Sequence, residues 1–407
     1  MTDRTDVVIA GGGYVGLSLA LGLARAVPGV RVAVVDLRPW RDLAGDPRAS
    51  AIAAAARRML TTLGVWDAIE PTAEAIREMI VTDSRLEDAV RPVFLTFDGV
   101  TAGGEPFAHM VPNGAMVSAL GAAAEAAGVA ILAPERVADF SADGGRVEVR
   151  LAGGRRIAAG LLVAADGVRS RLRGLAGIRT TTWDYGQSGI VTTIEHDRDH
   201  EGRAEEHFLP AGPFAVLPLK GGRRSSLVWS EKTALADRLV AGDDLVFETE
   251  LQRRVGHHLG EVRLAGPRAA YPLGLTLARD FVAPRFALVG DSAHGMHPIA
   301  GQGLNMGFRD VAALVEVLAE ALRIGRDPGA LDVLDDYQRW RRFDTWQMAA
   351  TTDVLNRLFS NDAAPVRMVR DVGLGLVERL PLLKRFFIGE AAGIGRGTPR
   401  LLAGEPV

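Results

Sequence analysis

The sequence predicts an α/β protein in which a mostly parallel sheet is interrupted by a second, sheet-rich region. Three observations support this fold class. Apolar strands alternate with a helix over residues 6–36, and the same alternation returns over residues 286–322. Between these segments, residues 187–230 resemble a meander of strands. Because alternating strands and helices are typical of a parallel sheet, we expect the middle region to be an insertion.

The first unit is the clearest element. Residues 6–10 (DVVIA) are apolar and predict a buried strand, and the turn GGGYVG follows them. A leucine-rich pattern predicts a helix to about residue 26, and residues 30–36 (VRVAVVD) predict a second buried strand. Together they form a βαβ unit of the expected length, about 30 residues.

The remaining elements follow from hydrophobic periodicity along the chain. We expect β structure within residues 76–97, short strands at 129–132, 146–151 and 161–165, and a strand at 286–290. We expect helices at residues 48–63, 115–127, 245–259 and 304–322, a long helix after Pro328, and further helices near the C-terminal end. This order predicts a discontinuous dinucleotide-binding domain from residues 1–75, 98–180 and 270–330, a sheet domain from 76–97 and 181–269, and a C-terminal helical region over 331–407.

Composition excludes several function classes. The chain has 407 residues, no cysteine and a formal net charge of −3. Disulfides, thiolate metal sites and cysteine nucleophiles are therefore excluded, and no general attraction to nucleic acid is expected. We see no signal peptide and no run of about 20 apolar residues that would cross a membrane.

The first glycine cluster predicts a dinucleotide site. Gly11, Gly13 and Gly16 form G-x-G-x-x-G between a strand and a helix. The first glycine permits the tight turn, the second lets a pyrophosphate approach the backbone, and the third lets helix and strand pack closely. Asp36 ends the next strand, where a carboxylate can accept hydrogen bonds from ribose hydroxyls. These features alone do not separate NAD from FAD.

A second glycine-rich stretch, GDSAHGMHPIAGQGLNMGFRD, spans residues 290–310. Asp291 follows the strand and can reach a polyhydroxylated chain such as the ribityl of a flavin. Pro298 fixes the backbone, while Gly301 and Gly303 let it pass close to a flat ligand. The helix that begins near residue 304 directs N–H groups and partial positive charge at the reduced flavin, and we assign Asn305 to the same site.

A third element lies between these two. Asp166 and Gly167 follow the predicted strand at residues 161–165 and precede a basic turn. In isolation an Asp-Gly pair would indicate only a turn.

The three elements, in this order and at these separations, resemble the single-component flavin monooxygenases related to para-hydroxybenzoate hydroxylase. The resemblance implies a glutathione-reductase-type, Rossmann-like FAD-binding domain with an inserted substrate domain. Gly11, Gly13 and Gly16 match the FAD fingerprint, Asp166-Gly167 matches a motif for FAD and reduced nicotinamide, and Gly290-Asp291 matches a motif for the flavin ribose and ribityl. Arg48 matches an arginine on the flavin side of the first long helix.

Within that family the chain looks like the ubiquinone-biosynthesis hydroxylases. The signs are His297 before Pro298, the run from Gly212-Pro213 to Leu217-Pro218, and the segment SSLVWS. The resemblance implies hydroxylation of a polyprenylated phenol by O₂ through a flavin C4a-hydroperoxide. It also implies that the electron donor is NAD(P)H or a reduced electron-transfer protein.

Catalytic residues are harder to assign. We place His297 and Pro298 on the flavin side as catalytic candidates, and Phe214, Val216, Leu217 and Pro218 as a candidate pocket wall, with simple core packing as the alternative. His207 and Tyr185 are considered as bases, although surface or core roles are favoured for both. We expect no metal, because the pair His294 and His297 has no nearby run of carboxylates.

Two other functions remain open at this point: hydroxylation of a small soluble aromatic, and a flavin-binding scaffold in a quinone-biosynthesis assembly. An apolar substrate would be met at a membrane surface or delivered by a partner. Residues 374–389 (LGLVERLPLLKRFFIG) suit an interfacial helix or one packed on its own domain. We expect a cytoplasmic location, with a peripheral position on the inner membrane as an alternative.

Overall fold

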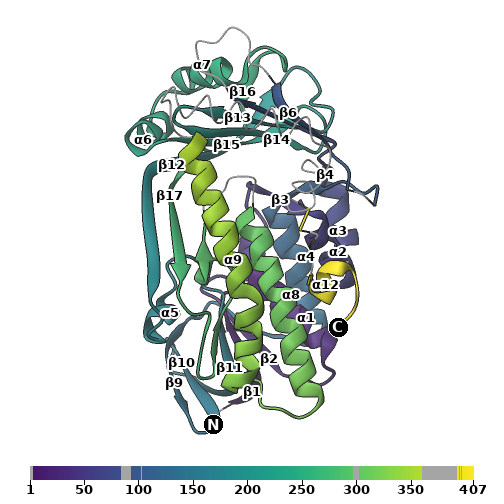
Figure 1. The fold of residues 1–407 in the computed structure, drawn as a ribbon, viewed down its shortest axis with the longest axis vertical. Helices are drawn as coiled ribbons and strands as arrows, with labels where there is room; N and C mark the ends of the chain where they lie inside the picture. The colour runs from purple at the N-terminus through teal and green to yellow at the C-terminus, as the bar shows by residue number, and fades with distance from the viewer. Residues whose placement is uncertain are drawn as a thin grey trace.

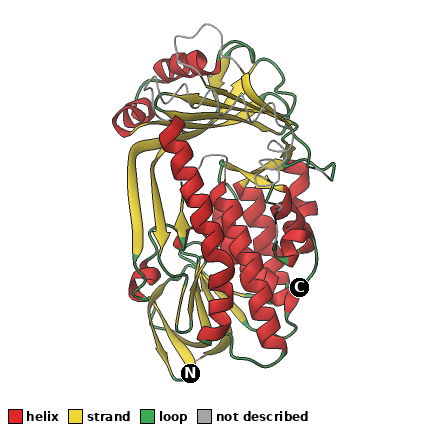
Figure 2. Ribbon diagram, in the orientation of Figure 1, coloured by secondary structure: helices red, strands yellow, loops and turns green. Residues whose placement is uncertain are grey.

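The computed structural model describes residues 3–83, 93–101, 103–296, 302–359, 392–393, 395 and 397–407. Its strands lie at both ends of the molecule and along one side between them, next to a layer of helices (Figure 2). The structure confirms the predicted α/β fold class.

The first sheet forms the dinucleotide-binding fold. Its strand order is β18 (Val282–Ala283), β19 (Phe286–Leu288), β11 (Arg156–Ala164), β1 (Asp3–Ala10), β2 (Val32–Val35) and β8 (Ala130–Leu132). The central strand β1 pairs in parallel with both β11 and β2. Strands β9 (Val137–Asp143) and β10 (Arg146–Leu151) extend β11 as an antiparallel edge. The consecutive apolar residues of β1 and β2 are buried, as expected of strands covered on both faces.

Helices cover this sheet and share its largest hydrophobic core. In sequence order they are α1 (Tyr14–Ala26), α2 (Ala54–Thr62), α3 (Trp66–Ile69), α4 (Asn113–Ala126), α5 (Arg171–Leu175), α8 (Gln302–Arg323) and α12 (Arg400–Ala403). Helix α1 packs against both α4 and α8. The long helix α9 (Leu331–Phe359) runs beside α8 from the first sheet towards the second (Figure 1).

The second sheet is formed mainly by the middle of the chain. Its order is β20 (His294–Gly295), β17 (Ala269–Ala278), β12 (Thr180–His196), β15 (Arg224–Lys232), β14 (Gly212–Leu219), β13 (Arg203–Leu209), β5 (Glu78–Asp83) and β6 (Val93–Asp98), and β16 (Val262–Leu264) pairs with β12. Helices α6 (Thr233–Ala241) and α7 (Asp244–Val255) lie over its outer face (Figure 1). A separate core of aromatic and aliphatic side chains fills the space beneath them.

One predicted helix is wrong over its first third. Residues Ala49–Ala53 form strand β3, which pairs antiparallel with β7 (Ala108–Pro112), and α2 begins only at Ala54. Strand β4 (Glu74–Ala75) completes this small sheet. The alanine-rich composition favours a helix only weakly, and pairing with a strand far along the chain overrides it.

Two further predictions need comment. Helix α7 ends at Val255 rather than near residue 259, because Gly256 adopts a φ of 83°, which a continuing helix does not allow. The segment 374–389 lies outside the described residues. Among the residues that the structure describes, none of the helices is both long and apolar enough to span a bilayer.

Candidate active site

The turn between β1 and α1 permits only glycine at two positions. Gly11 has a φ of 115°, and a Cβ there would lie 2.2 Å from the carbonyl oxygen of Ala165. A Cβ on Gly16 would lie 1.9 Å from the carbonyl oxygen of Gly11. At Gly13, by contrast, a Cβ would meet no atom within 4 Å, and no side chain caps the start of α1. Gly11 and Gly16 therefore close the turn, while Gly13 leaves the helix N-terminus open to a ligand.

Asp36 is held by the backbone at the end of β2. Its Oδ2 accepts a hydrogen bond from the N–H of Gly12 at 2.5 Å, and its Oδ1 accepts one from the N–H of Arg38 at 2.8 Å. The side chain is half-buried. Each carboxylate oxygen keeps acceptor capacity, so the residue is oriented and can still receive ribose hydroxyls.

The motif after β11 lies beside the same turn. Gly167 adopts a φ of 83°, and the exposed Asp166 accepts a hydrogen bond from the N–H of Leu172 at 3.5 Å. Burial of its surroundings raises the pKa of Asp166. Arg173 donates to the carbonyl oxygens of Ser292 at 2.7 Å and Val168 at 3.0 Å. It thereby ties this loop to the loop after β19.

The loop after β19 is held in place by a buried network of hydrogen bonds and ion pairs. Gly290, at a φ of 62°, donates its N–H to Oδ2 of Asp310 at 2.9 Å. The same carboxylate contacts Nε2 of His294 at 2.5 Å and accepts from Nε of Arg341 at 2.9 Å. Burial alone would raise the pKa of Asp310, but His294 and Arg341 outweigh it and hold that pKa below its usual value. His294 therefore belongs to this structural network.

Asp291 points away from this network, into a cavity between the two sheets. Its side chain is exposed to that space and lines it. The protein around it still raises the pKa of Asp291, with burial as the largest cause. Within the described part of the chain no group of three or more His, Asp or Glu residues could hold a metal ion.

This cavity has a volume of about 550 Å³ and extends from the start of α1 to the second sheet. At the nucleotide end it is lined by Gly13, Tyr14, Gly16, Arg38, Arg48, Gly167, Asp291, Gly303 and Asn305, among others. At the sheet end it is lined by Ile76, Met79, Phe107, Ala204, Glu206, Pro213, Ala215, Leu217, Val228 and Ser230, among others.

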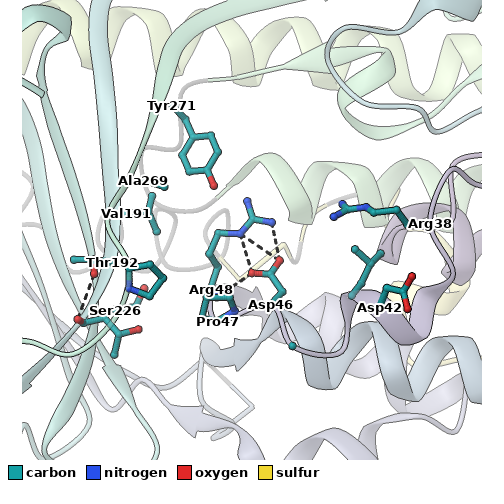
Figure 3. A pocket seen from close by; sticks show the side chains of 14 residues that line it. Arg38, Asp42, Asp46, Pro47, Arg48, Val191, Thr192, Ser226, Ala269 and Tyr271 are labelled. Atoms are coloured by element: carbon teal, nitrogen blue, oxygen red, sulfur yellow. Dashed lines mark hydrogen bonds and ion pairs between the residues drawn. The ribbon is translucent and has the colours of Figure 1, made fainter. Parts of the chain in front are cut away.

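Arg48 stands at the edge of this cavity and borders a second one of about 380 Å³. Its guanidinium pairs with Asp46 at 2.6 Å and lies 5.7 Å from the ring centre of Tyr271. Figure 3 shows the arginine and Asp46 facing each other, with Tyr271 on one side and Arg38 on the other. Hydrogen bonding to Asp46 holds the pKa of Arg48 above its usual range. This cation is fixed in place beside both cavities.

Asn305 connects the start of α8 to strand β3. Its Oδ1 accepts from the N–H of Ala53 at 3.0 Å, and its Nδ2 donates to the carbonyl oxygen of Ala51 at 2.9 Å. A Cβ on the neighbouring Gly303 would meet no atom within 4 Å, so the backbone there faces open space. His297, Pro298 and Gly301 lie outside the described residues.

The candidate pocket wall is divided between two faces of β14. Leu217 lines the cavity, but Phe214 and Val216 are packed in the core on the opposite face. Pro218 is buried and does not line the cavity. Side chains alternate along a strand, so residues 214 and 217 cannot share a face. Pro213 and Ala215 of the same strand line the cavity with Leu217.

The candidate bases are both engaged elsewhere. The Tyr185 hydroxyl donates to Asp353 at 2.9 Å, and His207 lies within a buried cluster on the face away from the cavity. Tyr14, Glu206 and Ser230 line the cavity but are not among the residues predicted from the sequence. For Tyr14 the signal is its place at the first position of α1. Glu206 and Ser230 have no such local signal, because β13 and β15 carry polar residues on both faces.

These residues fit an FAD. The open helix N-terminus at Gly13 suits a pyrophosphate, Asp36 suits a ribose, Asp291 suits the ribityl, and the clear space at Gly303 suits a flat ring. One cavity connects Gly13, Asp291 and Gly303 with the sheet, as a cofactor that must reach a substrate requires.

Comparisons with known proteins agree with this geometry. Residues 4–352 match the family model described as FAD binding domain. The chain is 47% identical to ubiquinone hydroxylase UbiL of Rhodospirillum rubrum, covering 99% of this chain and 93% of the relative. It is 35% identical to 3-demethoxyubiquinol 3-hydroxylase of Escherichia coli, covering 97% of this chain and 100% of the relative.

A solved structure shows the same fold at lower identity. The p-nitrophenol 4-monooxygenase PnpA from Pseudomonas putida has a TM-score of 0.79 at 21% identity, covering 97% of this chain and 100% of that one. The chain belongs to the FAD-dependent aromatic monooxygenases, and within them to the ubiquinone-biosynthesis hydroxylases. It is an FAD-dependent enzyme.

Proposed function

We propose that this monooxygenase hydroxylates the aromatic ring of a polyprenylated phenol. The observation that carries the proposal is the apolar sheet end of the cavity, which is continuous with the nucleotide end. The named activities of the two relatives, a ubiquinone hydroxylase and a demethoxyubiquinol hydroxylase, support the same substrate class.

The residues divide the work between the two ends. When bound, FAD supplies oxygen activated from O₂ by a reduced donor. The turn at Gly13 and the carboxylates of Asp36 and Asp291 hold the cofactor, and the network behind Gly290 keeps its loop in place. The apolar residues of β14 and β5 orient the ring and exclude water, which would otherwise favour release of peroxide.

Hydroxylation of a small, carboxylated aromatic is not favoured. Such a substrate needs a cation as its anchor, as an ion pair in a low-dielectric site requires. Among the described residues at the sheet end of the cavity, the ionisable side chain is a carboxylate, Glu206. Its negative charge would repel an anionic substrate and accept a neutral phenol.

The reaction is tested by product analysis. The purified protein should carry FAD and, with O₂ and a donor, add one oxygen atom to 2-geranylphenol, detected by mass spectrometry. Hydroxybenzoates that stimulate oxygen uptake more strongly than the prenylated phenol would contradict the proposal. The precursor that accumulates in cells lacking the protein identifies the ring position.

The electron donor remains a choice between two classes. We propose a direct reaction with NAD(P)H, in which Arg38 at the border of the second cavity pairs with a phosphate of the donor. Arg48 borders the same cavity but is already paired with Asp46. Mixing the holoenzyme with NADPH without oxygen should bleach the flavin. If the flavin stays oxidised with phenol bound, a protein donor is required. Membrane contact and assembly partners remain predictions, tested by recovery with membranes and with partner proteins of a full-length variant whose apolar residues within 374–389 are replaced by polar ones.

A further inference from the structure

Glu206 is a buried carboxylate that faces the cavity. It lies on β13, opposite Ala215 of β14, which in turn lies opposite Val228 of β15, and all three side chains line the cavity. Glu206 is only 5% exposed to solvent. In the part of the chain that the structure describes, its carboxylate has neither a hydrogen-bond donor nor a cation as partner.

Burial without a partner has an electrostatic consequence. It raises the pKa of Glu206 from 4.5 to about 7, and no charged neighbour contributes. The ionisable residues that border the same cavity are Tyr14, Arg38, Asp46, Arg48 and Asp291. On the strands beside Glu206, Glu205 and His207 are engaged on the opposite face of β13, and Glu78 of β5 is paired with Arg203.

A lone buried carboxylate is costly for the fold, so a structural role does not explain it. Burying a charge is unfavourable unless the charge is paired. A hydrophobic residue at position 206 would complete the apolar wall formed by Ala204, Ala215 and Leu217. A second unpartnered polar atom, Oγ of Ser230, lies in the same wall. The cavity therefore offers an acceptor and a hydroxyl in otherwise apolar surroundings.

We propose that Glu206 accepts the hydrogen bond of the substrate's phenol hydroxyl and takes its proton during oxygenation of the ring. This inference rests on the proposed function. The phenol O–H bond breaks and a carboxyl O–H bond forms, so the electron pair stays on the phenol oxygen and enriches the ring carbon that gains oxygen. When that carbon releases its own hydrogen as a proton to restore aromaticity, this proton goes to the second oxygen atom of O₂, which leaves as water. The carboxylic acid then returns the first proton to the ring oxygen, so Glu206 ends ionised and the phenol has gained one oxygen atom.

The magnitudes suit this role. A phenol has a pKa of about 10, so proton transfer to an ordinary glutamate is unfavourable by about six orders of magnitude. With the pKa of Glu206 at about 7, the deficit falls to about three orders of magnitude. With this pKa about half of Glu206 is ionised at pH 7 and most of it at pH 8, so the acceptor is present at neutral pH.

The first experiment measures binding without turnover. The probes are 2-geranylphenol and geranylbenzene, which differ by the hydroxyl group alone, and the signal is the absorbance change of the bound oxidised flavin. At pH 8 the wild type should bind the phenol about tenfold or more tightly than geranylbenzene, as a hydrogen bond to a carboxylate predicts. The preference should fall below about threefold in Glu206→Leu.

The second experiment measures the proton. In Glu206→Gln, which has nearly the same shape, kcat at pH 8 should fall by about 10²- to 10³-fold while FAD content is unchanged. The wild-type kcat should rise with an apparent pKa near 7, and this rise should be absent from the variant. Glu195→Gln is the matched control, because Glu195 is exposed on β12 and pairs with Arg224 at the surface.

The outcomes separate the two hypotheses. If the Glu206 variants, folded and loaded with FAD, keep the tenfold preference or stay within threefold of wild-type kcat, the role of Glu206 is wrong. It is also wrong if the wild type itself does not prefer the phenol. If the preference is present and disappears with Glu206, but the wild type forms no hydroxylated product, then the proposed reaction fails and phenol binding by Glu206 stands.

Discussion

Strand β13 carries two neighbouring glutamates in opposite environments. Glu205 faces the closed side of the sheet beneath α7, where it contacts Nε2 of His258 at 2.8 Å and Nε2 of His207 at 3.2 Å. Although burial opposes it, hydrogen bonding to these histidines lowers the pKa of Glu205 to about 2. Glu206 faces the cavity without such partners, and burial raises its pKa to about 7.

One strand therefore serves stability on one face and function on the other. The two carboxylates are equally buried, at 6% and 5% exposure, so burial does not separate them. Their hydrogen-bond partners distinguish them. A buried charge whose hydrogen bonds are satisfied supports the fold, whereas a buried charge without partners is left for a ligand. The same division holds along β14 and β15, where residues 214, 216, 227 and 229 fill the closed core and residues 215, 217, 228 and 230 line the cavity.

The largest expected effect is on the closed side. Glu205→Gln should lower the free energy of unfolding by about 3 to 5 kcal/mol at pH 7, because it breaks a buried charged network. Urea unfolding measures it, with Glu195→Gln as a surface control. A loss below about 1 kcal/mol would show that the histidines do not depend on this carboxylate. Glu205 would then not be the stabilising member of the pair.

The pH dependence of this term has a definite sign. The pKa of Glu205 falls from 4.5 to about 2 on folding, so the folded state favours the ionised form. Its contribution, about 3 kcal/mol, is present above pH 4.5 and is lost as the pH falls towards 2. In Glu205→Gln this part of the acid destabilisation should be absent.

The nucleotide end of the site could be predicted from the sequence because its signals are local. Gly11, Gly13, Gly16 and Asp36 lie within one βαβ unit, whose order and spacing suffice to place them around one turn. Asp291 could be predicted for the same reason, since it directly follows a recognisable strand.

The sheet end of the site could not be predicted from the sequence, because it depends on the pairing register between distant segments. Whether Glu205 or Glu206 faces the cavity is decided by pairing of β13 with β14 and β5, and a shift by one residue would exchange their faces. For that reason the predicted pocket wall, residues 214, 216, 217 and 218, included side chains from both faces of β14. Strand β3 was missed because its partner, β7, lies more than 50 residues away.

The second prediction concerns the cavity side and has the opposite sign. The pKa of Glu206 rises from 4.5 to about 7 on folding, so the folded state holds its proton more tightly. Below pH 4.5 the residue is protonated in both states, and its ionisation does not change the free energy of unfolding. Above pH 7 its ionisation lowers the free energy of unfolding by up to about 3 kcal/mol. Glu206→Leu should therefore gain stability relative to the wild type as the pH rises from 4 to 8, measured by urea unfolding. A constant difference between the two proteins would show that Glu206 has a hidden partner.

A third prediction contrasts neighbours on β14. Val216→Ala should cost about 2 kcal/mol of stability, because it opens space in the closed core, and should leave binding of 2-geranylphenol unchanged. Leu217→Ala should cost less than about 1 kcal/mol but weaken binding of that phenol by about fivefold to tenfold through lost apolar contact. Equal effects of the two substitutions on binding would mean that the cavity wall is not the substrate surface.

The smallest effect is expected from two serines on β15. Ser225 is on the closed side, where its Oγ lies 3.0 Å from Nε2 of His196, and Ser225→Ala should cost about 1 to 2 kcal/mol by leaving that nitrogen unpaired. Ser230 is on the cavity side and its Oγ has no partner, so Ser230→Ala should change stability by less than about 1 kcal/mol. If the substrate hydroxyl or its hydrogen-bonding network uses Ser230, the affinity for 2-geranylphenol should fall by about threefold while that for geranylbenzene is unchanged. A stability loss at Ser230 as large as that at Ser225 would mean that the Ser230 hydroxyl is hydrogen-bonded within the fold and is not left for a ligand. The division between a stabilising face and a ligand-binding face would then not hold for β15.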